Sequence, residues 1–423
     1  MDYKFRKFQL SQFFILSRGS LFSFLINVIS LYLFSVLYSR EDFGNYALFV
    51  SSVTLFSVLV TFRLENLLVL QKSIKEVVII GITCKKVIEY FSILISIFSL
   101  FLFSFSISFF EGLPILWLFV PFATFSLAHI LVFLNWNNKI KAYKLITNYR
   151  IIQALCVGVF GIIFGIYKLS IGLILAYSLG LVVSFLYLNM DFKSKTAAYT
   201  DLIVKNNDVK EIIRTNLNFI KNSFGVEFLV TITRHMPNFI LNAYFGNGIV
   251  GVYDMSLKIL NIPKNLISTN IGELYYQKAS VFYHRSNQKF RKITLNTCLI
   301  LFFIAILFYL PFLLFGEEIF SLFLGQKWIE SGELSEIIAC WYVLLFITSP
   351  MAYVFYIKRV LHRLFRFMLF SFFVKVVFLF CLVNFKTQMQ VIYLYSYGCI
   401  FLELLLLYTI TKTSFSEANI TRP

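Results

Sequence analysis

Residues 293–315 read ITLNTCLILFFIAILFYLPFLLF, a run of 23 residues without a charged side chain. A helix of about 20 residues, rising 1.5 Å per residue, spans the roughly 30 Å hydrocarbon core of a bilayer. This run therefore predicts a transmembrane helix. The whole chain agrees, because 59% of its 423 residues are hydrophobic, only 14% are charged and the mean hydropathy is +0.79. Such a composition excludes a soluble globular protein.

Similar apolar runs recur along the chain and predict about twelve transmembrane helices. We place them at residues 13–37, 46–70, 87–110, 113–134, 145–167, 169–190, 219–245, 250–276, 293–315, 337–357, 364–385 and 391–410. The runs lack the period-two alternation of a membrane β-barrel. The predicted fold class is therefore an all-α integral membrane protein, because only helices and closed barrels satisfy their backbone hydrogen bonds in lipid.

The longest connection, residues 191–218, is polar and divides the predicted helices into two sets of six. We expect an N-terminal six-helix lobe at residues 1–200 and a C-terminal six-helix lobe at 201–423. A short internal repeat agrees, since Gly44-Asn45-Tyr46 and Gly251-Val252-Tyr253 each open the second helix of a set. Two halves of this kind share one orientation in the membrane, and transporter substrates bind at the interface between such repeats.

Lys and Arg residues concentrate in alternate connections, and acids are commoner in the others. By the positive-inside rule, the basic connections and both termini are cytoplasmic. The same distribution explains the net charge of +17 without a nucleic-acid partner, whose binding surface would cluster on one soluble face. The six cysteines show no metal-binding or disulfide spacing, and no catalytic or phosphate-loop motif occurs. We therefore predict no enzyme activity, no cofactor and no metal site.

Charged residues inside the apolar runs are the candidate functional residues, because a charge in a membrane helix is costly and usually has a partner or a role. Arg63 and Glu65 interrupt VTFRLENLLVL at residues 60–70. On one continuous helix they would point about 200° apart, so we expect them not to pair with each other. Arg63 either reaches the cytoplasmic headgroups or faces a cavity.

Arg234 lies near the middle of the seventh predicted helix, three residues before Pro237, and Glu227 precedes it by seven residues on nearly the same face. The two are either a substrate-binding cation with a coupling carboxylate, which we favour, or a structural ion pair. His235 points to another face and is expected to be a packed, hydrogen-bonded residue, with a protonation switch as the alternative.

Three further cations are candidates for substrate binding. Lys258 follows Asp254 by four residues, a spacing that also suits a structural ion pair. Lys375 either lines a cavity or pairs with Glu403 on the neighbouring helix. Arg18 either lines a cytoplasmic vestibule or reaches the headgroups.

Several segments resemble a known family. SREDFGNYAL at 39–48, followed by FRLENLLVL at 62–70, resembles the first-to-second helix region of bacterial polysaccharide flippases. These form the O-antigen and oligosaccharide-lipid branch of the multidrug, oligosaccharidyl-lipid and polysaccharide exporter superfamily. Similar likenesses are carried by PNFILNAYFGNGIVGVYDMSLKILNIPKNLI at 237–267, LPFLLFGEEIFSLFLGQKWIESG at 310–332 and ITSPMAYVFY at 347–356.

This resemblance implies two six-helix lobes around a V-shaped central cavity in the bacterial inner membrane. It implies a substrate of undecaprenyl-diphosphate-linked oligosaccharide repeat units, of O-antigen or capsule type, moved from the cytoplasmic to the periplasmic leaflet by alternating access. The expected partners are this lipid-linked oligosaccharide, the bilayer, a coupling proton or sodium ion and polysaccharide polymerase machinery. The candidate substrate ligands are Arg234, Arg63, Lys258, Lys375 and Arg18; the candidate coupling carboxylates are Glu227 and Glu65.

Two alternatives stay open. A cation-coupled drug exporter or a peptidoglycan-precursor flippase would belong to the same superfamily, although the latter typically carries two further helices. A membrane polysaccharide polymerase would be an enzyme, and such polymerases typically present a large periplasmic loop. The longest periplasmic connection here, residues 315–336, is short and acidic, which disfavours the polymerase.

Overall fold

The computed structural model describes residues 21–71, 73–105, 116–197, 211, 213–384 and 386–415. Nine helices in these ranges are long and apolar enough to cross a membrane, and a shorter apolar helix spans Leu21–Leu37. These ranges contain no β-strand. The prediction of an all-α membrane protein is confirmed. Arg18 and most of the polar connection at 191–218 lie outside the described residues.

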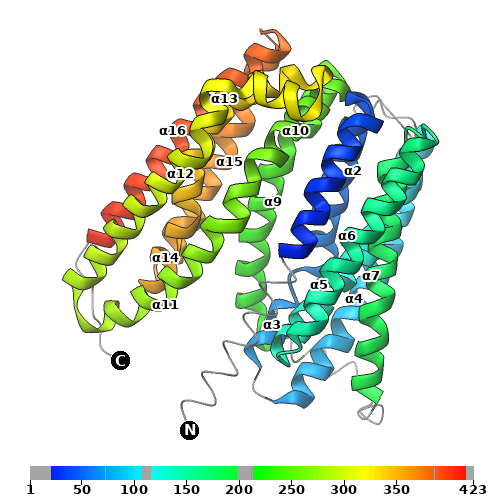
Figure 1. Cartoon of the computed structure of the whole chain (residues 1–423). Coiled ribbons are helices and arrows are strands. Elements are labelled where there is room, and N and C mark those ends of the chain that lie inside the picture. Colours follow the sequence, from blue (N-terminus) through cyan, green and yellow to red (C-terminus); the bar gives the residue numbers. More distant parts are fainter. Residues whose placement is uncertain are drawn as a thin grey trace. The chain divides into compact units, whose positions relative to one another are not determined.

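The chain divides into two compact units, residues 1–248 and 249–423. The first unit contains α2 (Arg40–Thr61), α3 (Asn66–Leu70), α4 (Ile74–Phe105), α5 (Leu116–Lys139), α6 (Tyr143–Ile166), α7 (Gly172–Thr196) and α9 (Leu217–Phe245). In this unit α2 lies beside α9 and also packs on α5, α4 packs on α5, and α6 packs on α7 (Figure 1). The division into lobes at residue 200 stays a prediction.

A capping box and a change of backbone conformation set the limits of α2. At its start, the Ser39 hydroxyl accepts from the Asp42 amide at 3.2 Å, and the Asp42 carboxylate accepts from the Ser39 amide at 3.0 Å. This is a capping box, which satisfies two amides that the helix leaves unpaired. At its end, Phe62 and Arg63 take positive φ values of 46° and 56°. Residues in this conformation cannot continue an α-helix.

The prediction of one helix over 46–70 is therefore wrong. The chain leaves α2 at Thr61, makes a turn and resumes as the short helix α3 at Asn66. Ring packing holds the turn in place, because the Phe62 ring centroid lies 4.9 Å from that of Phe91 and 5.4 Å from that of Phe224. Aromatic contacts of this kind stabilise a backbone conformation that Phe alone disfavours.

Gly44 allows a close backbone approach near the start of α2. A Cβ atom at Gly44 would lie 1.8 Å from the carbonyl oxygen of Asn247. Beside this contact, the Asn247 amide nitrogen Nδ2 donates to Asn45 Oδ1 at 3.1 Å. The Gly-Asn pair of the repeat therefore has a structural role at this position in the first unit, since any larger residue at 44 would separate the two backbones.

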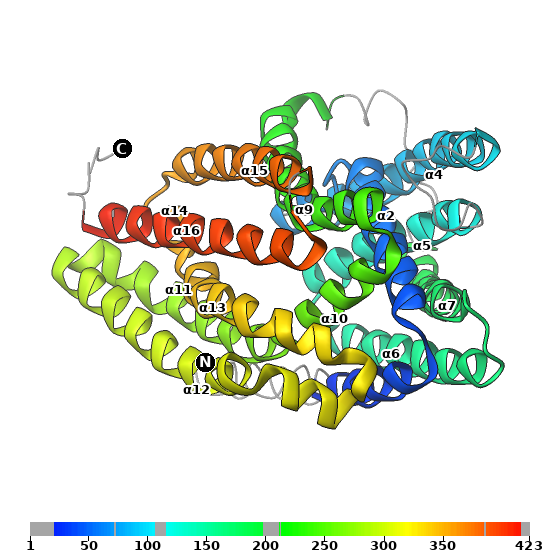
Figure 2. The same cartoon turned by 90° about the horizontal axis from the view of Figure 1, so that it is seen from above.

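The second unit is assembled around long helices. Its elements are α10 (Asn247–Pro263), which begins at the junction, η3 (Lys264–Ser268), α11 (Thr269–Arg285), α12 (Asn287–Leu324), η4 (Gln326–Trp328), α13 (Ile329–Met351), α14 (Tyr353–Ile357), α15 (Leu361–Val383) and α16 (Gln388–Phe415). Helix α13 lies between α12 and α16, and α15 packs on α16 (Figure 2). Buried Tyr309 of α12 donates to the Leu260 carbonyl at 2.9 Å, which ties α12 to α10.

Candidate functional site

Polar contacts join α2 and α3 to α9 along their length. Asn66 Nδ2 donates to Ser223 Oγ at 2.8 Å, and the Arg63 guanidinium pairs with the Glu227 carboxylate at 3.2 Å. Further along, Ser51 contacts His235 and Asn238. From contact to contact, the residue numbers decrease along α3 and α2 while they increase along α9, as expected for antiparallel segments. We call this set the α2–α9 ladder.

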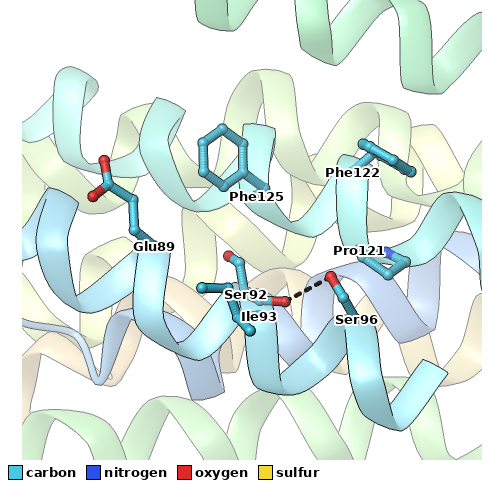
Figure 3. Close-up of a pocket in the computed structure, with 7 residues that line it drawn as sticks. All are labelled: Glu89, Ser92, Ile93, Ser96, Pro121, Phe122 and Phe125. Carbon is cyan, nitrogen blue, oxygen red and sulfur yellow. Dashed lines mark hydrogen bonds between the residues drawn. The ribbon is translucent and has the colours of Figure 1, made fainter. Parts of the chain in front are cut away.

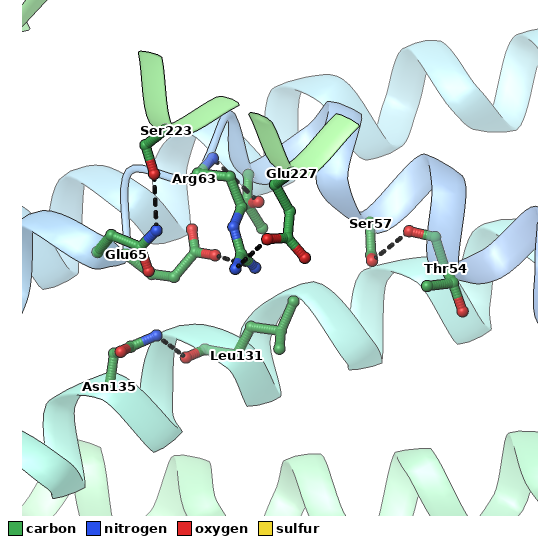
Figure 4. A network of polar contacts seen from close by, with 10 residues as sticks. Thr54, Ser57, Arg63, Glu65, Leu131, Asn135, Ser223 and Glu227 are labelled. Atoms are coloured by element: carbon green, nitrogen blue, oxygen red, sulfur yellow. Dashed lines mark hydrogen bonds and ion pairs between the residues drawn. The ribbon is translucent and has the colours of Figure 1, made fainter. Parts of the chain in front are cut away.

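Arg63 is the centre of the ladder's charged group (Figure 4). Its Nη1 lies 3.1 Å from Glu65 Oε1, and its Nη2 lies 3.2 Å from Glu227 Oε2. The Glu65 side chain is fully buried and that of Arg63 is 19% exposed, whereas that of Glu227 is 37% exposed. One guanidinium therefore has a buried partner and a partner that solvent can reach.

The expectation that Arg63 and Glu65 cannot pair is wrong. It assumed a helix through both residues, on which their side chains would diverge. The left-handed conformation of Phe62 and Arg63 removes that constraint and turns the guanidinium back toward Glu65. A buried carboxylate is stable only with a partner, and Arg63 supplies it.

The charge balance of this group has a chemical consequence. Two carboxylates share one guanidinium, which keeps its charge at any physiological pH. The group therefore holds one more acid than it can neutralise. Glu227 is the more exposed of the two acids and is therefore the one that solvent and small ions can reach.

Ser51 joins two α9 residues through one oxygen. Its hydroxyl donates to the Ala47 carbonyl at 2.7 Å, so its oxygen acts as an acceptor for the other contacts. Asn238 Nδ2 donates to it at 3.0 Å, and His235 Nδ1 lies 2.9 Å from it. These bonds assign the proton of a neutral His235 to Nδ1, since the Ser51 hydrogen is already used. The prediction of a packed, hydrogen-bonded His235 is confirmed.

Arg234 differs from Arg63 in its surroundings. It is exposed, and no ion pair or hydrogen bond joins its side chain to any residue that the structure describes. Glu227 is bound to Arg63 instead. The alternative reading of Arg234 and Glu227 as a structural ion pair is therefore wrong, and Arg234 is available to a ligand.

The second unit holds the remaining predicted residues. Lys258 pairs with Asp254 at 2.6 Å, as the spacing predicts. Lys375 Nζ lies 5.5 Å from the centroid of the Trp341 ring. Glu403 is buried and accepts from Thr348 Oγ1 at 2.6 Å, and it has no ion pair with Lys375 in the described chain. The alternative of a Lys375–Glu403 pair is thus wrong.

Sequence reasoning missed the uncharged residues of the ladder, namely Ser51, Asn66, Ser223 and Asn238. Each is a single small polar residue in an apolar run and gives no signal alone. Their one detectable signal is that polar positions of α2 and α9 match in antiparallel order. Among the described residues, no group of three or more His, Cys, Asp or Glu could hold a metal ion.

Several solved structures with a similar fold are named as transporters or as a flippase. The lipid II flippase MurJ in an inward closed conformation has a TM-score of 0.71 at 13% identity, covering 94% of this chain and 87% of that chain. An inward-facing multidrug resistance MATE family transporter of the MOP superfamily has a TM-score of 0.63 at 16% identity, covering 95% and 96%. The MATE multidrug transporter DinF-BH in complex with R6G has a TM-score of 0.55 at 13% identity, covering 97% of each chain.

At these identities the likeness concerns the fold. A comparison with curated proteins gives no match. A family model described as "Polysaccharide biosynthesis protein" matches residues 34–333, which include α2 to α12 and every residue of the α2–α9 ladder. The chain therefore belongs to this family of polysaccharide biosynthesis proteins.

Proposed function

We propose that the protein is a flippase for lipid-linked oligosaccharides. It moves undecaprenyl-diphosphate-linked repeat units, of O-antigen or capsule type, from the cytoplasmic to the periplasmic leaflet of the inner membrane by alternating access. Membership of a polysaccharide biosynthesis family supports the substrate class. The fold, similar to that of a lipid II flippase and of multidrug transporters, supports transport rather than catalysis.

The diphosphate headgroup sets the physical requirement. It cannot cross hydrocarbon without a large desolvation cost, so the protein must provide a wet path lined with cations. Helix α9 suits such a path because, although 29 residues long, it is not among the helices apolar enough to count as membrane spans. Polar helices of membrane proteins face protein or water rather than lipid.

The observation that carries the proposal is Arg234, an exposed arginine on α9 with no ion pair in the described residues. An arginine without a counterion is costly in lipid, so it requires water or an anionic ligand. Its planar guanidinium can donate two parallel hydrogen bonds to phosphate oxygens. We assign it the role of diphosphate ligand.

We assign coupling to the charged group of the ladder. Binding of the coupling ion at Glu227 would neutralise its charge and weaken its bond to Arg63, while Glu65 keeps the guanidinium in place. The freed edge of Arg63 could then bind the diphosphate. In this way Arg63 serves as a second substrate ligand, and Glu227 serves as the coupling carboxylate. Lys258, Lys375 and Arg18 remain proposed ligands without further support.

The decisive experiment replaces Arg234 in cells that depend on the protein for surface polysaccharide. Arg234→Ala should abolish export while the protein accumulates normally, since the side chain holds no other residue in place. Arg234→Lys should restore only part of the activity, because a point charge cannot reproduce the planar fork. Arg214→Ala, which removes an exposed arginine shortly before α9, is the matched control and should export normally. Normal export by Arg234→Ala would refute the assignment.

A cation-coupled drug exporter is the second candidate, favoured by the similarity in fold to MATE transporters. It predicts efflux of cationic dyes that depends on the protein. The flippase proposal predicts wild-type dye sensitivity in cells that lack the protein, together with loss of surface polysaccharide.

A further inference from the structure

A hollow of about 410 Å³ lies between α4 and α5 in the first unit (Figure 3). Helix α4 contributes Glu89, Ser92 and Ser96, and α5 contributes Pro121, Phe122 and Phe125. Its volume falls in the range of small-molecule sites, roughly 300–1,000 Å³. The α4 wall therefore combines these polar residues with Ile93, and the α5 wall is mainly aromatic.

The sequence explains why the helices leave room here. Pro121 has no N–H, so the carbonyl of Trp117 loses the donor that a helix would provide. Ser99 of α4 donates its hydroxyl to this carbonyl and joins the two helices. Ser92 and Ser96 share a face of α4 with Ser99, and their short side chains leave the adjacent space unfilled.

Two groups in the hollow have unused capacity. Ser92 is only 8% exposed, yet its hydroxyl has no hydrogen-bond partner among the described residues. Ser96 cannot supply one, because its own hydroxyl donates to the Ser92 carbonyl at 2.8 Å. Glu89 is exposed and has no ion pair or hydrogen bond with a described residue, although it interacts electrostatically with Lys85 one turn earlier. An unpartnered buried hydroxyl and, one turn away on the same helix, an exposed carboxylate without an ion pair can both bind a polar ligand.

The surroundings indicate where the ligand comes from. Helix α4 is a candidate membrane span, and its exposed side chains near the hollow are large and apolar: Tyr90 is 71% exposed, Ile93 59% and Ile97 61%. In α5, Phe122 is 69% exposed. Such a surface faces lipid, so the occupant is an amphipathic molecule of the bilayer.

Charge narrows the class of lipid. Glu89 disfavours an anionic headgroup, and thus the diphosphate of the proposed substrate, and it favours an ammonium group. Lys85, one turn earlier, donates to Asn189 at 3.3 Å and also interacts electrostatically with Glu89, although it forms no ion pair with it. Lys86, also about one turn before Glu89, is exposed and can meet a phosphate. An ammonium and a phosphate together describe a zwitterionic phospholipid.

We propose that this hollow binds a membrane phospholipid with a primary ammonium headgroup. The ammonium contacts Glu89 and the Ser92 hydroxyl, the phosphate contacts Lys86, and an acyl chain packs on Phe122 and Phe125. The site is separate from the α2–α9 ladder and does not depend on the proposed transport function. The first unit would thus bind a specific class of membrane lipid.

The test uses the purified full-length protein in vesicles of phosphatidylethanolamine that contain a fraction of the same lipid with a photoreactive diazirine on its acyl chain. After illumination, mass spectrometry should locate the label on α4 and α5. Glu89→Gln should reduce this labelling roughly tenfold, as expected for loss of a charge-assisted hydrogen bond. Glu76→Gln, which removes an exposed acid from the first turn of α4, should leave it unchanged.

Two further experiments distinguish recognition of the ammonium headgroup from nonspecific contact with lipid. A phosphatidylglycerol probe, which lacks the ammonium, should label the site weakly in wild-type protein. Ser92→Leu keeps the charge of Glu89 but fills the hollow, and it should also reduce labelling. Equal labelling by the two lipids, or full labelling of Glu89→Gln, would overturn the proposal. Thermal unfolding of each variant shows whether it is folded, and no arm requires transport.

Discussion

Arg63 Nη1 lies 3.1 Å from Glu65 Oε1, although a single residue separates them in the chain. The pair exists because the backbone leaves the α-helix at Thr61 and passes through two left-handed residues. Glu65 is thereby enclosed completely, and its only ion-pair partner in the described chain is this arginine. The turn, the buried acid and the arginine form one structural unit. Glu227, whose side chain is 37% exposed, binds the same arginine from α9.

Replacing Arg63 should therefore destabilise the protein. Arg63→Leu leaves a buried carboxylate without a partner, which typically costs about 3 kcal/mol or more. The midpoint of thermal unfolding in detergent should fall clearly. The double variant Arg63→Leu with Glu65→Leu removes both charges and should recover most of the loss, since an apolar pair of similar volume is tolerated in such positions. Arg214→Leu is the control. Equal loss in the single and double variants would show that an unpaired Glu65 is not the cause of the loss.

Membership of the all-α class follows from the sequence because the length of an apolar run maps directly onto the thickness of a bilayer. The break after Thr61 does not follow. Neither Phe62 nor Arg63 is a residue that favours positive φ, and no Gly or Pro marks the turn. The conformation is imposed by packing of Phe62 against α4 and α9, which is information from distant parts of the chain.

In the candidate site, too, some features can be predicted from the sequence and others depend on contacts between distant segments. Arg234 and Glu227 stand out in the sequence, because a charge deep in an apolar run is rare. Their partners cannot be read in the same way. Glu227 binds Arg63 of another helix, and Glu403 binds Thr348 rather than Lys375, because ion pairs depend on how helices face each other. Pairs within one turn of helix are different, and Lys258–Asp254 was predictable from spacing alone.

Gly44 should be intolerant of any side chain. Gly44→Ala places a methyl group 1.8 Å from the Asn247 carbonyl oxygen, so the backbones must move apart and the Asn45–Asn247 hydrogen bond should be lost. We expect a loss of about 1–3 kcal/mol, typical of overpacking, seen as a lower midpoint of thermal unfolding. Gly248→Ala is a matched control at the same junction. Its Cβ meets nothing closer than the Glu41 carboxylate at 3.4 Å, so it should be neutral or slightly stabilising. The reverse order of the two variants would contradict the packing.

Lys358 should make stability depend on pH. It follows α14 and donates to the last carbonyls of α16, Thr413 at 2.6 Å and Ser414 at 3.1 Å. Burial, with the nearby cations Arg291 and Arg363, lowers the pKa of Lys358 to about 8. In the unfolded chain the proton is held to about pH 10.4. Between these values the unfolded state binds more protons, so this residue adds stability as pH rises.

The measurement compares wild type with Lys358→Met. The difference between their unfolding midpoints should shift in favour of wild type from pH 7.5 to pH 9.5. The neutral amine still has two N–H groups for the two carbonyls, so the contacts persist. Lys278→Met, which removes an exposed lysine of the same unit, is the control. A difference that stays constant across this range would show that Lys358 does not titrate there.

The orientation in the membrane can be tested on one helix. Gln288 and Glu317 are both exposed and lie within α12. At 1.5 Å per residue, the stretch from Gln288 to the break at Phe315 alone is about 40 Å long, so the two residues fall on opposite sides of a bilayer. Lys289, Arg291 and Lys292 cluster at the first end, and acids at the second, which by the positive-inside rule puts Gln288 in the cytoplasm. In a cysteine-free background, Glu317→Cys should react with an impermeant thiol reagent in intact cells. Gln288→Cys should react only after the cells are permeabilised. Labelling of Gln288→Cys in sealed cells would reverse the orientation, and with it the proposed direction of transport from the cytoplasmic leaflet.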